Sequence, residues 1–202
     1  MGMNAASVKK GIEKISRKMN ENKDYLIRLD QQNGDGDLGV SMSEGFQAVA
    51  DYVDSAEETD LGKLRLKAGS VFNESAPSSL GTIISFAFMG MAKELKGKEE
   101  VDAAGFAKAA KAGVQKIMDK AGSKPGEKTI LDALCPAVEA LEKADSFEEG
   151  FRLAAQAAAE GSEATKTMKS VHGRAAYYGE KSIGLLDGGS VVGRLIFEAL
   201  AE

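Results

Sequence analysis

The chain has 202 residues, a length that one domain with a well-filled core accommodates. With 43% hydrophobic residues, 28% charged residues and a formal net charge of -5, its composition is that of a soluble globular protein. The acidic balance argues against nucleic-acid binding, and the longest apolar run, residues 83–92, is about half of what a membrane-spanning helix needs. A single cysteine and a single histidine exclude an internal disulfide and a Cys/His zinc site. The first residues lack the apolar stretch of a secretory signal, so we expect a cytoplasmic protein.

Helical periodicity recurs along the chain, because apolar side chains stand three and four residues apart. Eight such stripes lie within residues 8–19, 42–53, 61–71, 80–92, 106–117, 131–141, 147–158 and 192–200. Strand-like alternation is almost absent, and no flexible linker divides the chain. We therefore expect one all-α domain of eight helices spanning residues 1–202. The longest irregular stretch, residues 170–189, is polar and rich in glycine, and a loop of this length in a compact domain is usually functional.

Three aspartates crowd the connection between the first two expected helices. Asp30, Asp35 and Asp37 fall within eight residues, and glycines between them allow a tightly folded backbone. Carboxylates held this close repel one another, and a hard cation that accepts oxygen ligands relieves the repulsion. The spacing therefore predicts a metal site, although a solvated turn is an alternative because Asn, Gly and Asp are all turn formers.

A calcium loop is a second alternative for the same segment. Ligands at the spacing of an EF-hand would be Asn33, Asp35, Asp37 and Glu44. This arrangement places Leu38 where the sharp turn of that loop needs glycine, and it leaves Asp30 unused. The alternative implies a non-enzymatic calcium-binding regulator.

The polar stretch before the last helix holds further candidates. The glycine-rich start of that helix offers backbone amides to an anion, and Arg174 could pair either with a phosphate or with Asp187 or Glu180. We expect His172 to be an exposed loop residue without a catalytic role. Cys135 lies on an apolar helical stripe and is expected to be a core residue.

Three separated blocks together resemble a known family. They are LDQQNGDGD at residues 29–37, KPGEKTILD at residues 124–132, and GRAAYYGEKSIGLLD at residues 173–187. In order and approximate spacing they resemble the nucleotide-binding L subunit of dihydroxyacetone kinase, and the resemblance spans nearly the whole chain. Agreement at three blocks is far more specific than any single motif.

The resemblance implies an antiparallel eight-helix barrel that binds a nucleotide, ADP or ATP, at its mouth. It implies that Asp30, Asp35 and Asp37 hold two Mg²⁺ ions that bridge the phosphates. The nucleotide-binding residues that it implies are Leu38, Gly39, Ser78, Ser79, Ala121, Ile130, Arg174, Asp187, Gly188 and Gly189. It implies no catalytic side chain on this chain, because a separate K subunit holds the ketose substrate. In some bacterial relatives ADP stays bound and a phosphohistidine carrier protein recharges it, whereas other relatives consume free ATP.

The sequence departs from the family pattern at two clear positions. Leu38 stands where a histidine often follows the aspartate motif, and Gly188 replaces the usual proline after Asp187. The segment with Ser78 and Ser79 follows the family's Ser-Gly-rich loop only loosely. A kinase of the same fold that serves another acceptor, such as a different ketose or a fatty acid, is therefore an alternative, as is a paralogue that binds nucleotide without transferring phosphate.

Overall fold

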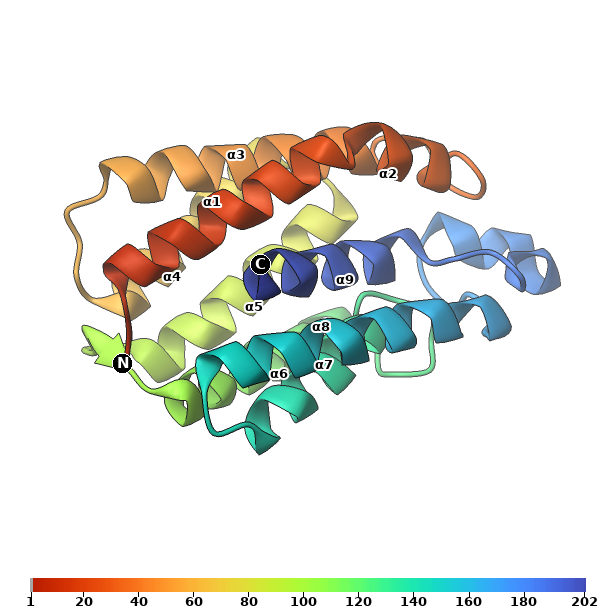
Figure 1. Cartoon of the computed structure of the whole chain (residues 1–202). Coiled ribbons are helices and arrows are strands. Elements are labelled where there is room, and N and C mark those ends of the chain that lie inside the picture. Colours follow the sequence, from red (N-terminus) through yellow and green to blue (C-terminus); the bar gives the residue numbers. More distant parts are fainter. Residues whose placement is uncertain (1) are drawn as a thin grey trace.

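The computed structural model describes residues 2–202 and is almost entirely helical (Figure 1). Its α-helices are α1 (Ala5–Glu21), α2 (Lys23–Asp30), α3 (Leu38–Ser55), α4 (Leu61–Ser75), α5 (Ser79–Leu95), α6 (Ala103–Ala121), α7 (Leu131–Lys143), α8 (Phe147–Ala164) and α9 (Gly188–Ala201). Two 3-10 helices precede α9, namely η1 (Thr165–Thr167) and η2 (Arg174–Ser182). Within residues 2–202, the one sheet is a short antiparallel pair of strands, β1 (Met3–Asn4) and β2 (Glu100–Val101). All eight expected helices are confirmed.

The sequence does not predict the ninth helix, α2. Helix α1 ends at Glu21 and is capped by Asn22, whose backbone and side-chain N–H groups both donate to the carbonyl of Lys18. Helix α2 then continues in the same direction (Figure 1). Its buried side chains are only Leu26 and Leu29, a stripe too short for periodicity to reveal. Helix α2 thus lengthens the first member of the barrel and carries Asp30 at its end.

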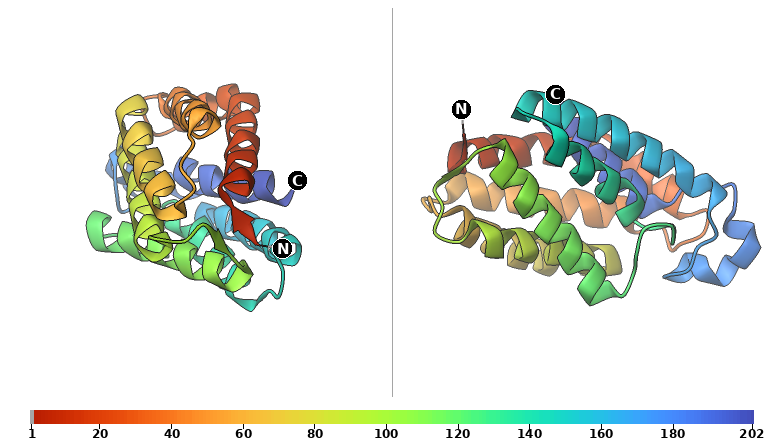
Figure 2. Two further views of the ribbon diagram at one scale, coloured as in Figure 1. Left: turned by 90° about the vertical axis from the view of Figure 1, so that its left-hand side faces the viewer. Right: turned by 90° about the horizontal axis from the view of Figure 1, so that it is seen from below.

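The helices form a closed antiparallel barrel. From α3 onward each helix packs against the next one in the chain, α1 packs against α3, and α9 packs against α1 to close the ring. The left view of Figure 2 looks roughly along the helices. This arrangement confirms the antiparallel eight-helix barrel. In the part of the chain that the structure describes, no helix combines the length and the hydropathy that crossing a membrane requires.

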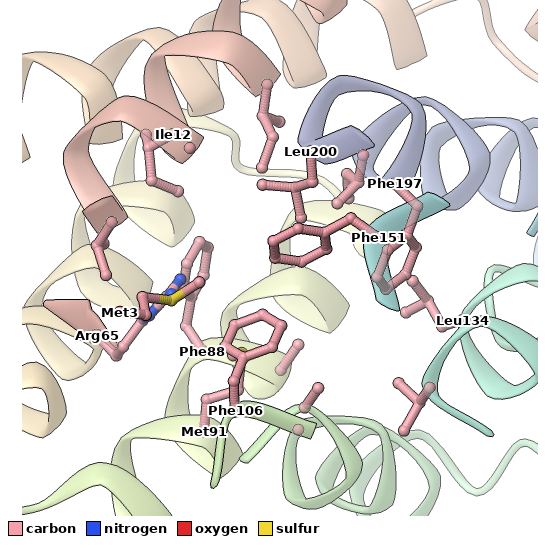
Figure 3. Close-up of a pocket in the computed structure, with 18 of the residues that line it drawn as sticks. Met3, Ile12, Arg65, Phe88, Met91, Phe106, Leu134, Phe151, Phe197 and Leu200 are labelled. Atoms are coloured by element: carbon pink, nitrogen blue, oxygen red, sulfur yellow. The ribbon is translucent and has the colours of Figure 1, made fainter. Parts of the chain in front are cut away.

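The inward faces of the helices enclose an apolar cavity of about 670 Å³. Phenylalanines from α5, α6, α8 and α9 line it, among them Phe88, Phe106 and Phe151 (Figure 3). Arg65 of α4 is buried in the same wall, and burial lowers the pKa of its guanidinium to about 10. Its Nε has no hydrogen-bond partner within residues 2–202. The barrel therefore has a largely apolar chamber whose wall includes the buried cationic side chain of Arg65.

The alternation of helix direction gathers four connections at one end of the barrel, which we name the mouth. These connections are residues 31–37, 76–78, 122–130 and 165–187, on the right-hand side of Figure 1. Helices α3, α5, α7 and α9 begin there, so the positive dipole ends of four helices, with N–H groups that lack partners within the helix, face the mouth. Every candidate site residue from the sequence lies in or beside one of these connections.

Candidate functional site

The three aspartates of the first connection form a compact cluster at the mouth. Each offers a carboxylate oxygen, and these oxygens all lie within 4.8 Å of one another. A turn brings them together: Asp30 Oδ2 accepts a hydrogen bond of 2.7 Å from the backbone N–H of Gly36, whose φ of +82° is accessible to glycine. The structure therefore brings Asp30, Asp35 and Asp37 together, and their binding of a metal stays a prediction.

The surroundings of Asp37 disfavour the charged form of its carboxyl group. Partial burial, followed by the negative charges of Asp35 and Asp30, raises the pKa of its carboxyl group. It occupies the N-cap position of α3, yet its side chain accepts no capping hydrogen bond. Its side chain is therefore not used for capping, and an all-oxygen set of this kind suits a hard divalent cation.

The ligand set of a calcium loop is not assembled. Within residues 2–202, the acidic group that could hold a metal contains Asp30 and lacks Glu44. Helix α3 already begins at Leu38, so Glu44 lies in its second turn with an exposed side chain. The structure therefore favours the cluster with Asp30 over the EF-hand set for this segment.

Arg174 links the connection between α8 and α9, residues 165–187, to the aspartate cluster. Its Nη2 lies 2.9 Å from Asp35 Oδ2, so its partner is neither Asp187 nor Glu180. Both side chains are well exposed, and an exposed ion pair of this kind contributes little to stability. The pair instead places a guanidinium over the acidic connection, where it can also meet an anion.

The start of α9 lies against the starts of α3 and α7. A Cβ added to Gly188 would lie 2.6 Å from Leu38 Cδ2, and one added to Gly189 would lie 3.3 Å from the backbone nitrogen of Ile130. Asp187 caps α9 by accepting a 2.6 Å hydrogen bond from the N–H of Ser190. Burial raises the pKa of the Asp187 carboxyl to about 7. The structure thus brings together five of the ten nucleotide-binding candidates.

The remaining candidates occupy the edges of the mouth. Ser78 caps α5, with its hydroxyl accepting from the N–H of Gly81 at 3.1 Å, and Ser79 is the exposed first residue of that helix. Ala121 ends α6 and packs against the core. Gly39 faces α2, where any side chain would clash with the carbonyl of Lys23. The role of Gly39 that the structure shows is therefore close helix packing.

Two side chains at the mouth make contacts that the sequence does not predict. His172 is not a free loop residue, because its Nε2 lies 2.6 Å from Glu127 Oε2, and this contact holds the pKa of the Glu127 carboxyl below its usual range. Lys128 is 3% exposed, and its Nζ is surrounded by backbone carbonyls. Neither contact is readable from spacing, since its partners lie 37 to 57 residues away. Cys135 packs against the core as expected, and burial raises the pKa of its thiol to about 11.

Comparison with known proteins identifies the family of this barrel. A family model described as the DAK2 domain matches residues 32–202, which include the seven α-helices from α3 to α9 and all but the first residue of the connections at the mouth. The chain belongs to the DAK2 domain family.

Individual relatives of this DAK2 domain are kinases or kinase subunits. It is 34% identical over 188 residues, 93% of this chain and 91% of the relative, to "PEP-dependent dihydroxyacetone kinase 1, ADP-binding subunit DhaL" of Listeria innocua. It is 31% identical to "L-erythrulose 1-kinase" of Mycolicibacterium smegmatis, covering 90% of this chain but 33% of that protein.

A solved structure shares the fold of this DAK2 domain. The dihydroxyacetone kinase from C. freundii, solved in complex with AMP-PNP and Mg²⁺, superposes with a TM-score of 0.78 at 22% sequence identity. The match covers all of this chain and 34% of the solved one, so the DAK2 domain corresponds to about a third of that kinase.

Proposed function

We propose that the chain is the nucleotide-binding subunit of a dihydroxyacetone kinase, a single domain of residues 1–202 that binds Mg-ADP or Mg-ATP at the barrel mouth. The aspartate cluster is the observation that carries this proposal: three convergent carboxylates lie at an end of the barrel that four helix N-termini face. Carboxylates recruit a divalent cation and helix N-termini attract phosphate, so the mouth suits a metal-bound polyphosphate. The name of the Listeria innocua relative, an ADP-binding subunit, supports the same ligand.

The residues present fit two Mg²⁺ ions. Asp30, Asp35 and Asp37 supply oxygen ligands only, and the Asp37 side chain is not used for capping. Mg²⁺ prefers one or two carboxylates with phosphate oxygens completing its shell, so three carboxylates and a polyphosphate accommodate a pair of ions. Bound Mg²⁺ neutralises phosphate charge, which favours phosphoryl transfer.

The nucleotide-binding side chains have distinct tasks in this proposal. Arg174, released from Asp35, pairs with a phosphate oxygen, and the N-termini of α5 and α9 with Ser78, Ser79, Gly188 and Gly189 present N–H donors. Ala121 and Ile130 flank the base, and Leu38 directly follows the metal ligand Asp37. Gly39 acts indirectly by letting α3 approach α2.

The substrate is held on another protein. A ketose-binding K subunit docks at the mouth and receives the phosphoryl group, so this chain needs no catalytic side chain of its own. The PEP-dependent name of the Listeria innocua relative supports a bound ADP that a phosphohistidine carrier protein recharges. Erythrulose is a second candidate acceptor, because an L-erythrulose kinase is 31% identical to the chain.

Native mass spectrometry and calorimetry test the nucleotide site. We expect the purified chain to retain ADP with two Mg²⁺ ions, and we expect D35N and D37N to abolish Mg-dependent ADP binding. These substitutions remove charge and keep side-chain shape. E44Q is the matched control, since Glu44 lies outside the cluster, and it should leave the affinity for ADP unchanged.

Unchanged ADP affinity in D37N would overturn the assignment. Calcium binding that E44Q removes, without nucleotide, would instead restore the regulatory alternative. Product analysis with purified partner chains, using dihydroxyacetone and erythrulose side by side, identifies the acceptor.

A further inference from the structure

Lys128 has a buried ammonium group surrounded by main-chain oxygens. Its Nζ lies 2.9 Å from the carbonyl oxygen of Thr165, 3.2 Å from that of Met168, and 2.6 Å from those of Ser182 and Leu185. An ammonium has three N–H donors, so four carbonyls cannot each receive a linear hydrogen bond of their own. The arrangement therefore resembles the coordination shell of a monovalent cation, in which carbonyl dipoles replace hydration water.

The four carbonyls come from both ends of the connection between α8 and α9, residues 165–187. Thr165 and Met168 bracket η1 directly after α8, whereas Ser182 ends η2 and Leu185 lies two residues before the cap of α9. Between these ends lies the stretch that carries Arg174. One buried charge thus joins the beginning and the end of the segment, and it holds both to the connection between α6 and α7.

The backbone of Lys128 has a strained conformation that the contacts of its side chain must offset. Its φ is +61°, the single positive value of a residue other than glycine within residues 2–202. This conformation costs an L-residue about 1 kcal/mol or more, and glycine adopts it freely. The contacts of the ammonium offset this strain and the desolvation that lowers the pKa of the group.

We propose that Lys128 acts as a tethered monovalent cation and is a positioning residue, whose ammonium fixes the segment that places Arg174 and the Asp187 turn at the mouth. The consequence for binding rests on the proposed nucleotide function. A free cation that carbonyl oxygens can coordinate, such as K⁺ or methylammonium, should replace the ammonium once the side chain is removed.

The test uses K128G, which relieves the backbone strain and empties the carbonyl site. We expect K128G to bind Mg-ADP at least about tenfold more weakly than the wild type in choline chloride. Affinity should recover in KCl or methylammonium chloride of equal ionic strength, and the wild type should respond to neither salt. K128M is the matched control, because its stem still fills the site and no cation should restore its affinity.

A second measurement needs no nucleotide. Trypsin cleavage after Arg174 and Lys181, both exposed, reports the order of the segment. Cleavage of K128G should be faster than cleavage of the wild type in choline chloride and should slow in KCl. If the wild type fails to bind ADP, the proposed function fails, and this assay still decides the role of Lys128.

Three results would overturn the tethered-cation role. The first is that K128G, without K⁺, binds Mg-ADP as tightly as the wild type and is cleaved by trypsin at the wild-type rate. The second is a loss that no cation restores, and the third is a K128G chain that circular dichroism shows unfolded in every salt. A K128G chain that folds in KCl and unfolds in choline chloride supports the proposal.

Discussion

Asp187 performs two tasks with one carboxyl group, because it caps α9 and lies where burial opposes its charge. Burial raises its pKa to about 7, and the negative charges of Asp132 and Asp30 add to the effect. The folded chain therefore keeps this proton at pH values where an unfolded chain, with an ordinary aspartate pKa of 3.8, has lost it. Folding takes up a proton in that window, so the contribution of Asp187 to stability falls as the pH rises from about 4 to about 7.

D187N tests this dependence while it preserves the cap, since asparagine is an equally good N-cap acceptor. We expect the wild type to lose more free energy of unfolding between about pH 5 and about pH 8 than D187N loses. Urea unfolding at the two pH values measures the difference. An identical loss in both proteins would contradict the assignment of the proton to Asp187.

D60N is the control, because the pKa of Asp60 is shifted in the opposite direction to that of Asp187. Asp60 caps α4, and backbone hydrogen bonds, the one from Lys63 foremost, lower the pKa of its carboxyl group. Its stabilising contribution is present above an ordinary aspartate pKa, so it is complete at both test values. D60N should lower stability equally at the two pH values and leave their difference unchanged.

At the scale of elements, the starts of α3 and α9 meet through one pair of residues. Leu38 and Gly188 are the two departures that the sequence resemblance singles out, and the structure places them next to each other. A Cβ on Gly188 would lie 2.6 Å from Leu38 Cδ2, closer than carbon atoms pack. Leucine at position 38 therefore fits because position 188 has no side chain.

A double-mutant cycle measures this dependence. We expect G188A to cost about 1 kcal/mol by displacing the buried Leu38 side chain. In the L38A background the same change should be neutral, which gives a coupling energy of about 1 kcal/mol. G150A in α8 is the control, because its Cβ would meet Leu141 and should combine additively with L38A. Additive costs for G188A and L38A would contradict the contact.

The elements also show what sequence reasoning can reach. The eight longer helices were predictable, because each buries a stripe that repeats within one continuous segment. The aspartate cluster was predictable for a similar reason, since its members are neighbours in sequence. Helix α2 was missed because two buried leucines make no measurable stripe.

The contacts that complete the mouth were beyond sequence reasoning. The ammonium site of Lys128 gathers carbonyls 37 to 57 residues away, and His172 meets Glu127 across 45 residues. Backbone carbonyls carry no residue-specific signal, and a positive φ at a lysine has no sequence signature. Such contacts follow from the closed path of the chain rather than from any local pattern.

At the scale of the whole molecule, the last helix completes the barrel. Helix α9 packs against α1, α7 and α8, and Glu202 pairs with Arg17 and Lys18 of α1. It also begins at the Asp187 turn, so a single element closes the wall and finishes the mouth. The first and last helices of the chain must therefore meet before either the wall or the mouth is complete.

This closure sets an order of events during synthesis. At about 5 to 20 residues per second, a ribosome needs about 10 to 40 s to make residues 1–202, and it makes the three aspartates well before α9. The nascent barrel stays open along α1 until α9 leaves the exit tunnel. We expect ribosomes stalled with only residues 1–186 exposed to capture no Mg-ADP, and the released full chain to bind it. Binding by the stalled chain would show that the mouth forms without its closing helix.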